Sequence, residues 1–116
     1  MFSSEKFEVH CYFHNWPKID NAKITTNLYR ITQELLQNAV KHSEAKNAYL
    51  QFIGETNQSI SLIYEDDGIG FNYSENAGKG LGFRNIENRV ALLDGSLQFD
   101  TSIESKGRTI VIDVEL

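Results

Sequence analysis

The sequence predicts a two-layer α/β sandwich, in which a mixed five-stranded sheet carries its helices on one face. The hydrophobic pattern alternates between a two-residue and a three-to-four-residue period, in the order strand, helix, two strands, helix, two strands. Two helices cannot cover both faces of five strands, so we expect both on the same face. The 116 residues suffice to bury one core, and we expect a single domain over residues 1–116.

Composition excludes several classes of protein. A net charge of −5 argues against a nucleic-acid binder, which needs a basic face. The single cysteine, Cys11, excludes an internal disulfide and a cysteine metal cluster, and it fits a reducing compartment. No apolar run approaches the roughly 20 residues that span a bilayer, and the first residues lack a signal-peptide pattern. We therefore expect no contact with nucleic acid or membrane.

The first strand is predicted over residues 7–14, where apolar and polar side chains alternate. One face carries the side chains of Phe7, Val9, Cys11 and Phe13. His10 and His14 fall on the other face, roughly 13 Å apart along a strand, which is too far to share a metal ion. We expect both histidines to be solvated.

An amphipathic helix is predicted from about Thr25 to Ser43. Its apolar stripe recurs at three- and four-residue steps and consists of Leu28, Ile31, Leu35, Leu36, Ala39 and Val40. Thr25 or Thr26 is expected to cap the start of this helix. Lys41 and His42 would place positive charge in its last turn, where the helix dipole favours it.

A different face of this helix carries Glu34 and Asn38, which are one turn apart and therefore neighbours. A solvated helix face would explain the pair. The same two side chains also offer oxygen atoms of the kind that Mg²⁺ prefers.

The remaining elements are a hairpin, a helix and a second hairpin. Residues 45–54 and 58–65 are expected to form the first hairpin. A helix should start at Leu81 and end near Asp94-Gly95, with glycine as its stop signal. Two further strands complete the sheet, Ser96–Thr101 and Arg108–Glu115.

Two glycine-rich motifs interrupt these elements. Asp66-Asp67-Gly68-Ile69-Gly70 follows a predicted strand, and its glycines permit close approach of the backbone to a ligand. An ordinary solvated Asp-Gly turn is the simpler explanation of this motif. Gly78-Lys79-Gly80-Leu81-Gly82 leads into a helix N-terminus, where free N–H groups and the helix dipole favour an anion such as phosphate. Lys79, together with Lys41 or His42, would offset phosphate charge.

Four motifs, in this order, resemble those of the ATP-binding domain of sensor histidine kinases. They are Gln33–His42, Asp66–Gly70, Gly78–Gly82 and Gly107–Thr109. They resemble the family's asparagine box, its two glycine boxes and its final glycine-threonine element, and the likeness covers residues 25–116. The family belongs to a superfamily with DNA gyrase, a heat-shock chaperone and the mismatch-repair ATPases, and its fold is the Bergerat-type ATP-binding fold. Asn-Ala-Val-Lys-His is most similar to the nitrate-sensor and fluidity-sensor branch.

The resemblance implies a role for each matching position. Asn38 would bind the Mg²⁺ that bridges the ATP phosphates. Asp66 would accept a hydrogen bond from the adenine amino group, with Gly68 in the same motif and Gly70 letting the base approach. Thr109 would lie near the adenine.

The phosphate side would involve the second glycine motif and the end of the first helix. The motif's nucleotide-binding positions would be Gly78, Lys79, Gly80, Leu81 and Gly82, with the glycines as the hinge of a lid. Lys41 and His42 would approach the phosphates. Glu34 would support the metal, polarise the acceptor or, as in hydrolysing relatives, prepare a water. Because phosphoryl transfer depends mostly on positioning, Glu34 and Asn38 would also be the catalytic residues.

Three other polar residues near these motifs are expected to have different roles. Asp67 occupies a variable position and is interpreted as a turn residue. Arg84 and Arg89 are expected to form surface or structural ion pairs rather than phosphate contacts.

The function implied is that of a two-component kinase domain that binds Mg-ATP and transfers the γ-phosphoryl group to a histidine on a separate dimerising hairpin. A response regulator would act downstream. No histidine here matches the acceptor, so the chain should bind ATP without phosphorylating itself. It would be the cytoplasmic part of a membrane-anchored bacterial sensor, separated from its sensor and dimerisation regions.

Two alternatives stay open. One is a stand-alone serine kinase of the anti-sigma-factor class, and the other is a nucleotide-binding module without catalysis. The Lys-His ending of the asparagine box and the short segment before the second glycine box favour the histidine kinase.

Overall fold

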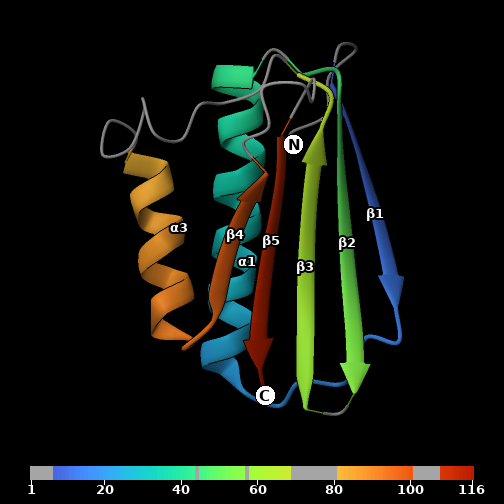
Figure 1. Cartoon of the computed structure of the whole chain (residues 1–116), viewed down its shortest axis with the longest axis vertical. Coiled ribbons are helices and arrows are strands. Elements are labelled where there is room, and N and C mark those ends of the chain that lie inside the picture. Colours follow the sequence, from blue (N-terminus) through green and yellow to red (C-terminus); the bar gives the residue numbers. More distant parts are fainter. Residues whose placement is uncertain (1–6, 44, 57, 69–80, 101–107) are drawn as a thin grey trace.

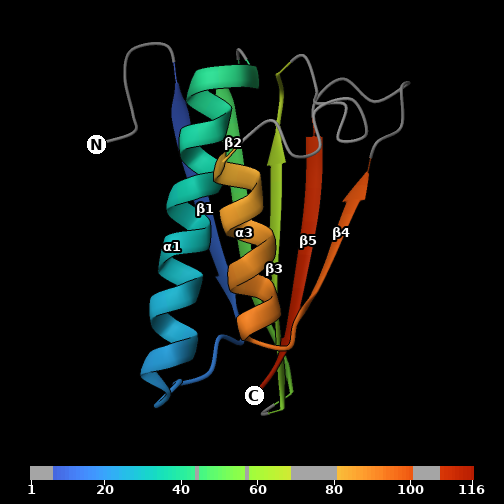
Figure 2. The same ribbon diagram turned by 90° about the vertical axis from the view of Figure 1, so that its left-hand side faces the viewer.

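The computed structural model describes residues 7–43, 45–56, 58–68, 81–100 and 108–116. One sheet contains five strands in the spatial order β1-β2-β3-β5-β4. Their bounds are β1 Glu8–His14, β2 Asn47–Thr56, β3 Ser59–Asp66, β4 Ser96–Asp100 and β5 Arg108–Glu115. Helices α1 (Ala22–Asn38) and α3 (Leu81–Leu92) lie side by side on one face of the sheet (Figures 1 and 2). The predicted fold class is therefore confirmed.

The sheet is mixed because one strand pair differs from the others. Strand β1 runs parallel to β2, whereas β2 with β3, β3 with β5, and β4 with β5 are antiparallel. Helix α1 provides the long crossover that a parallel pair requires. The register places Tyr64 opposite both Leu50 and Ile110, so these three side chains share the helix-facing side.

The core fills the space between this side of the sheet and the two helices. Ile31 and Leu35 from α1 and Ile86 from α3 are fully buried. They pack in one cluster with buried strand residues such as Leu62 and Ile112. Burial of each such side chain contributes about 1.5–3 kcal/mol relative to exposure, so α1 and α3 are held chiefly by this apolar contact.

Helix α1 starts earlier than its apolar stripe indicated. Asn21 adopts an extended conformation, and its Oδ1 accepts hydrogen bonds from the backbone N–H groups of Lys23 (3.0 Å) and Ile24 (3.3 Å). Asparagine is among the best N-cap residues, so the prediction that Thr25 or Thr26 caps the helix was wrong. A turn of π-helix, η1 (Ala39–Ser43), follows the helix.

Helix α3 ends close to the predicted position, but its glycine has an unexpected role. The backbone N–H groups of Asp94 and Gly95 donate to the carbonyls of Ala91 and Val90, a Schellman pattern. The left-handed residue is Asp94, with φ of 52°, and not Gly95. A Cβ at Gly95 would lie 2.7 Å from the carbonyl oxygen of Asp113. Gly95 is therefore required for close packing against β5.

The two histidines of β1 differ in environment. His14 is exposed, as expected. His10 is half-buried, its Nε2 lies 3.1 Å from Oδ1 of Asn47, and its ring stacks on Tyr49 with 4.9 Å between centroids. The expectation of a solvated His10 was wrong, because the parallel pairing of β1 with β2 places it beside Tyr49.

Neither helix in the described part of the chain combines the length and apolar character needed to cross a membrane.

Candidate functional site

Three of the predicted site segments meet at one end of the sandwich. The C-terminal end of α1, the C-terminal end of β3 and the N-terminal end of α3 all lie at the upper end of Figure 1. Asn38 is the last residue of α1, Asp66 is the last residue of β3, and Leu81 is the first residue of α3. Segments from distant parts of the sequence therefore end or begin at the same end of the sandwich.

Asp66 is a buried carboxylate with a defined orientation. Its exposed fraction is 6%, and it lies on the helix-facing side of β3, two residues after the buried Tyr64. The Tyr64 hydroxyl donates to Oδ2 of Asp66 (2.7 Å), and the backbone N–H of Gly68 donates to Oδ1 (3.1 Å). A carboxylate has about four lone-pair sites, so one carboxylate can accept several hydrogen bonds at once.

Asn38 is buried at the end of α1, with an exposed fraction of 8%. Its Nδ2 has no hydrogen-bond partner among the described residues. A buried unpaired amide costs about 1–3 kcal/mol, so a polar partner at this position would be favourable. Glu34 lies one helical turn earlier and is half-buried.

The two basic residues after Asn38 belong to η1 rather than to the last turn of an α-helix. Lys41 is exposed. The backbone of His42 is part of η1, but its side chain lies outside the described part of the structure. Single π-turns occur frequently at functional sites, which agrees with the position of η1 next to Asn38.

Much of the second glycine motif falls outside the described residues, namely Gly78, Lys79 and Gly80, as does Gly70 of the first motif. The backbones of Leu81 and Gly82 form the first turn of α3, as the sequence predicted. The first-turn N–H groups of an α-helix have no intrahelical partner, so this end of α3 suits an anion.

Asp67 has a role that the sequence analysis missed. Its Oδ1 accepts from the backbone N–H groups of Lys46 (2.8 Å) and Asn47 (2.9 Å), and its Oδ2 accepts from Nδ2 of Asn47 (2.9 Å). These bonds, led by the one from the Asn47 side chain, lower the pKa of Asp67 below its ordinary value. Asp67 therefore fastens the end of β3 to the start of β2. Its partners are 20 and 21 residues away, so no local pattern indicates them.

Thr109 is not brought to Asp66. It pairs with the exposed Glu65 and alternates with the buried Ile110, so it lies on the sheet face opposite the helices. The residue paired with Asp66 is Arg108. The alternation of Ile110, Ile112 and Val114 in the sequence is the signal that could have placed Thr109 on the other face, because neighbours in a strand point to opposite faces.

Arg89 joins the two helices. Its Nη1 donates to Oδ1 of Asn27 on α1 (3.1 Å), whereas Arg84 is exposed. This agrees with the structural role expected for Arg89, although its partner is an amide and not a carboxylate.

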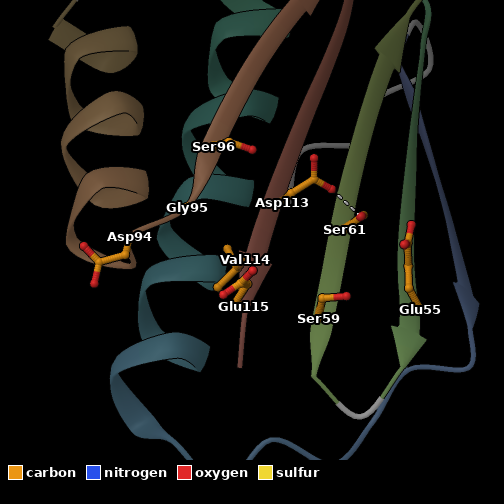
Figure 3. A pocket seen from close by; sticks show the side chains of 9 residues that line it. All are labelled: Glu55, Ser59, Ser61, Asp94, Gly95, Ser96, Asp113, Val114 and Glu115. Carbon is orange, nitrogen blue, oxygen red and sulfur yellow. Dashed lines mark hydrogen bonds between the residues drawn. The ribbon is translucent and has the colours of Figure 1, made fainter.

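A pocket of about 500 Å³ lies at the opposite end of the molecule, near the end of α3 and the C-terminus (Figure 3). Its lining contains the four carboxylates of Glu55, Asp94, Asp113 and Glu115, and Ser61 donates to Asp113 (2.5 Å). The described lining contains no basic side chain, so the pocket is unsuited to nucleotide phosphates. Across the described residues, no group of three or more carboxylate, histidine or cysteine side chains could hold a metal ion by itself.

Comparison with solved structures defines the class of fold. The histidine kinase domain of the Erythrobacter litoralis EL346 blue-light activated kinase superposes with a TM-score of 0.75 at 20% identity, covering 99% of this chain and 54% of that one. The Acinetobacter baumannii histidine kinase AdeS gives a TM-score of 0.76 at 18% identity, covering 95% and 54%. The fold is therefore that of histidine kinase ATPase domains.

The sequence comparisons define the family. Residues 24–116 match the family described as histidine kinase-, DNA gyrase B- and HSP90-like ATPases, and the chain belongs to this family. The predicted resemblance is thereby confirmed, and the family implies that ATP is used.

The curated relatives are sensor histidine kinases. The chain is 47% identical over 92 residues to the sensor histidine kinase ComP of Bacillus subtilis, and 32% identical over 89 residues to the kinase/phosphatase DegS of Brevibacillus brevis. These matches cover 78% and 77% of this chain. The chain spans only 12% of ComP and 22% of DegS, so it corresponds to one part of such proteins.

Proposed function

We propose that this chain is the ATP-binding catalytic domain of a two-component sensor histidine kinase, with its nucleotide site at the end of the sandwich where α1 and β3 end. The observation that carries the proposal is the buried, oriented carboxylate of Asp66 at the same end as the buried, unpaired amide of Asn38. Because the chain belongs to an ATPase family, we assign Asp66 to recognition of the adenine and Asn38 to the phosphate side of the nucleotide.

Asp66 would read the adenine. Tyr64 and Gly68 fix its carboxylate, so little side-chain entropy is lost when it accepts a further hydrogen bond from the adenine amino group. The buried position strengthens this bond, because the local dielectric is lower than in water. Gly68, whose backbone is buried beside Asp66, and Gly70 would leave room for the base.

The phosphates would lie toward the N-terminal end of α3. Free N–H groups of the first turn, at Leu81 and Gly82, and the preceding Gly78, Lys79 and Gly80 would contact them. Lys41 and His42 at η1 would add positive charge. Thr109 is left out of the proposed site because it lies on the other face of the sheet.

The residues at the end of α1 fit a magnesium ion. The amide oxygen of Asn38 is of the kind that ligates Mg²⁺, which is usually held by one or two side chains together with substrate phosphates and waters. The unpaired Nδ2 is a donor, so it would face a phosphate oxygen rather than the metal. A bound Mg²⁺ would neutralise phosphate charge, with Asn38 as its ligand and the half-buried Glu34 as support for the metal or for the phosphate acceptor.

The phosphoryl acceptor would be a histidine on a separate helical hairpin of the same kinase, and a response regulator would act downstream. Of the three histidines, His10 and His14 lie on β1 and His42 lies in η1. None is on a dimerising hairpin, so the isolated chain would bind ATP without phosphorylating itself. The domain would be the cytoplasmic part of a membrane-anchored bacterial sensor.

Calorimetric titration with Mg-ATP tests the site. We expect the wild-type chain to bind and Asp66→Asn to lose nearly all affinity, because one acceptor oxygen becomes an amide that cannot accept from the adenine. Glu65→Gln is the matched control, since it removes the neighbouring carboxylate on the opposite face and should bind normally. Unchanged affinity in Asp66→Asn would rule out the assigned role.

A phosphoryl-transfer assay tests the catalytic assignment. The chain is mixed with γ-labelled ATP and the dimerisation hairpin of a relative such as ComP, and the labelled residue is identified. Acid-labile phosphohistidine on the hairpin is the expected product. Acid-stable phosphoserine would favour the alternative serine kinase.

A further inference from the structure

We propose that Asp67 and Asn47 form a positioning clamp, which holds the chain after β3 so that Asp66 is presented correctly to the nucleotide. The inference rests on the proposed function of Asp66, and it assigns neither clamp residue a contact with ATP. Asn47 belongs to none of the glycine or asparagine motifs and is the first residue of β2.

The clamp consists of four hydrogen bonds between two short segments. Three N–H groups, from Lys46 N, Asn47 N and Asn47 Nδ2, converge on the carboxylate of Asp67 at 2.8–2.9 Å. In the reverse direction, the backbone N–H of Asp67 donates to the carbonyl of Asn47 at 3.2 Å. Bonds to an ionised carboxylate are stronger than neutral ones, so this one residue anchors the point where the β3 ladder stops.

The clamp acts on Asp66 through its neighbours in the chain. Asp66 is the last ladder residue, paired with Ala48, and Gly68 donates its N–H to Oδ1 of Asp66. Asp67 lies between these two residues, and its hydrogen bonds to Lys46 and Asn47 fix the position of the backbone that leads into Gly68. Loss of the clamp would free Gly68 to move, and the orientation of the Asp66 carboxylate would be less restricted.

Both the nitrogen and the oxygen of the Asn47 side-chain amide form hydrogen bonds, and the bond from the oxygen side connects the clamp to β1. While Nδ2 donates to Asp67, Oδ1 lies 3.1 Å from Nε2 of His10, whose ring stacks on Tyr49. With a proton on Nε2, His10 donates to Asn47 and fixes the orientation of its amide. Strand β1 and the Asp66–Gly68 turn are therefore joined through the side chains of His10 within β1, Asn47 at the start of β2 and Asp67 after the end of β3.

A reciprocal exchange of the two side chains tests the clamp. Asn47→Asp alone places two carboxylates against each other and should weaken Mg-ATP binding about tenfold, the equivalent of one charge-assisted hydrogen bond. Asp67→Asn alone places the new amide nitrogen against Nδ2 of Asn47. It should weaken Mg-ATP binding less, about threefold, because the Asn47 amide can rotate so that its oxygen accepts from the new amide, provided that His10 changes tautomer and accepts from Nδ2.

The double variant Asn47→Asp/Asp67→Asn restores the side-chain bond with donor and acceptor exchanged, and the amide oxygen introduced at position 67 can still accept from the backbone N–H groups of residues 46 and 47. We expect its affinity for Mg-ATP to return to within about twofold of the wild type, a coupling that additive structural damage would not produce. Glu65→Gln is the charge control, and affinities are measured by calorimetry well below each variant's melting temperature. An Asn47→Asp variant that binds like the wild type, or a double variant no better than Asn47→Asp, would overturn the proposal.

A second readout separates this inference from the proposed function. Amide hydrogen exchange at Gly68, followed by NMR without nucleotide, reports the bond from Gly68 to Asp66 directly. Exchange should be faster in both single variants and recover in the double variant. If the wild type failed to bind ATP, the proposed function would be wrong, but the exchange rates of the Gly68 amide would still test the clamp. If the Gly68 exchange rate were the same in the wild type and the single variants, the clamp proposal would be wrong regardless of the measured ATP affinities.

Discussion

The hydroxyl of Tyr64 donates a hydrogen bond of 2.7 Å to Oδ2 of Asp66, two residues further along the same strand. Alternate residues of a strand share a face, so β3 itself supplies a donor to the carboxylate at its end. Tyr64 is fully buried, with Leu50 and Ile110 beside it in the register, and its position is therefore set by the core. The packing of the sheet thus fixes a polar group at the candidate nucleotide site.

Tyr64→Phe should weaken both stability and nucleotide binding. Removal of the hydroxyl takes a donor from a buried carboxylate, and we expect the free energy of unfolding to fall by about 1–2 kcal/mol. Affinity for Mg-ATP should fall severalfold, because Asp66 is less strictly oriented. Chemical denaturation and calorimetry measure the two effects. Tyr49→Phe, which removes a phenol hydroxyl on the opposite face, is the control, and equal effects of the two changes would contradict the explanation.

Asn38→Ala should separate metal-dependent from metal-independent binding. We expect affinity for ATP to fall about tenfold with Mg²⁺ and to change little with EDTA, because the side chain would act through the metal. Loss of the Nδ2 group should not lower stability without nucleotide, since Nδ2 has no partner among the described residues. Asn38→Asp, which keeps an oxygen ligand, is the comparison. Equal losses with and without Mg²⁺ would count against metal ligation.

The hydrogen bonds to Asp67 should make stability depend on pH in acid. The side-chain bond from Asn47, followed by backbone bonds, lowers the folded-state pKa of Asp67 below 3.8. A lowered pKa means that the unfolded chain takes up the proton first, so this contribution is present above about pH 4 and is lost as the pH falls through the folded-state pKa. The effect should be small because Asp67 is exposed. Urea unfolding at about pH 6 and about pH 3 should show a smaller acid-induced loss for Asp67→Asn than for wild type, and identical losses would refute this.

Substitutions of two neighbouring residues at the end of α3, Asp94 and Gly95, should change the stability of the fold in opposite directions. Asp94 has φ of 52°, a conformation that glycine adopts without strain, so Asp94→Gly should stabilise the fold by about 0.5 kcal/mol. Gly95→Ala should destabilise it by about 1–3 kcal/mol, because the new Cβ would lie 2.7 Å from the backbone oxygen of Asp113. Thermal unfolding of both variants measures the difference. Stabilisation by Gly95→Ala would show that the helix end is misassigned.

The hydrophobic periodicity predicted the helices and strands well, because the residues that must be buried in the core recur with the period of each element. The apolar stripe of α1 and the alternation in β3 and β5 correspond to buried residues such as Leu35, Leu62 and Ile112. Helix caps were predicted less well. Asn21 lies before the apolar stripe begins, and a choice between Asn21 and Thr25 depends on backbone conformation rather than on hydrophobicity.

The sequence by itself determined the family, the fold class and the motif positions, because motif order and hydrophobic period are local properties of the chain. The tertiary structure alone decided three relationships: the placement of the C-terminal ends of α1 and β3 at the same end of the sandwich, the attachment of Asp67 to Asn47, and the position of Thr109 on the sheet face opposite to Asp66. Each depends on how strands align and which face a side chain takes. A shift of one residue in register would reverse every face, and only the packed sheet excludes that shift.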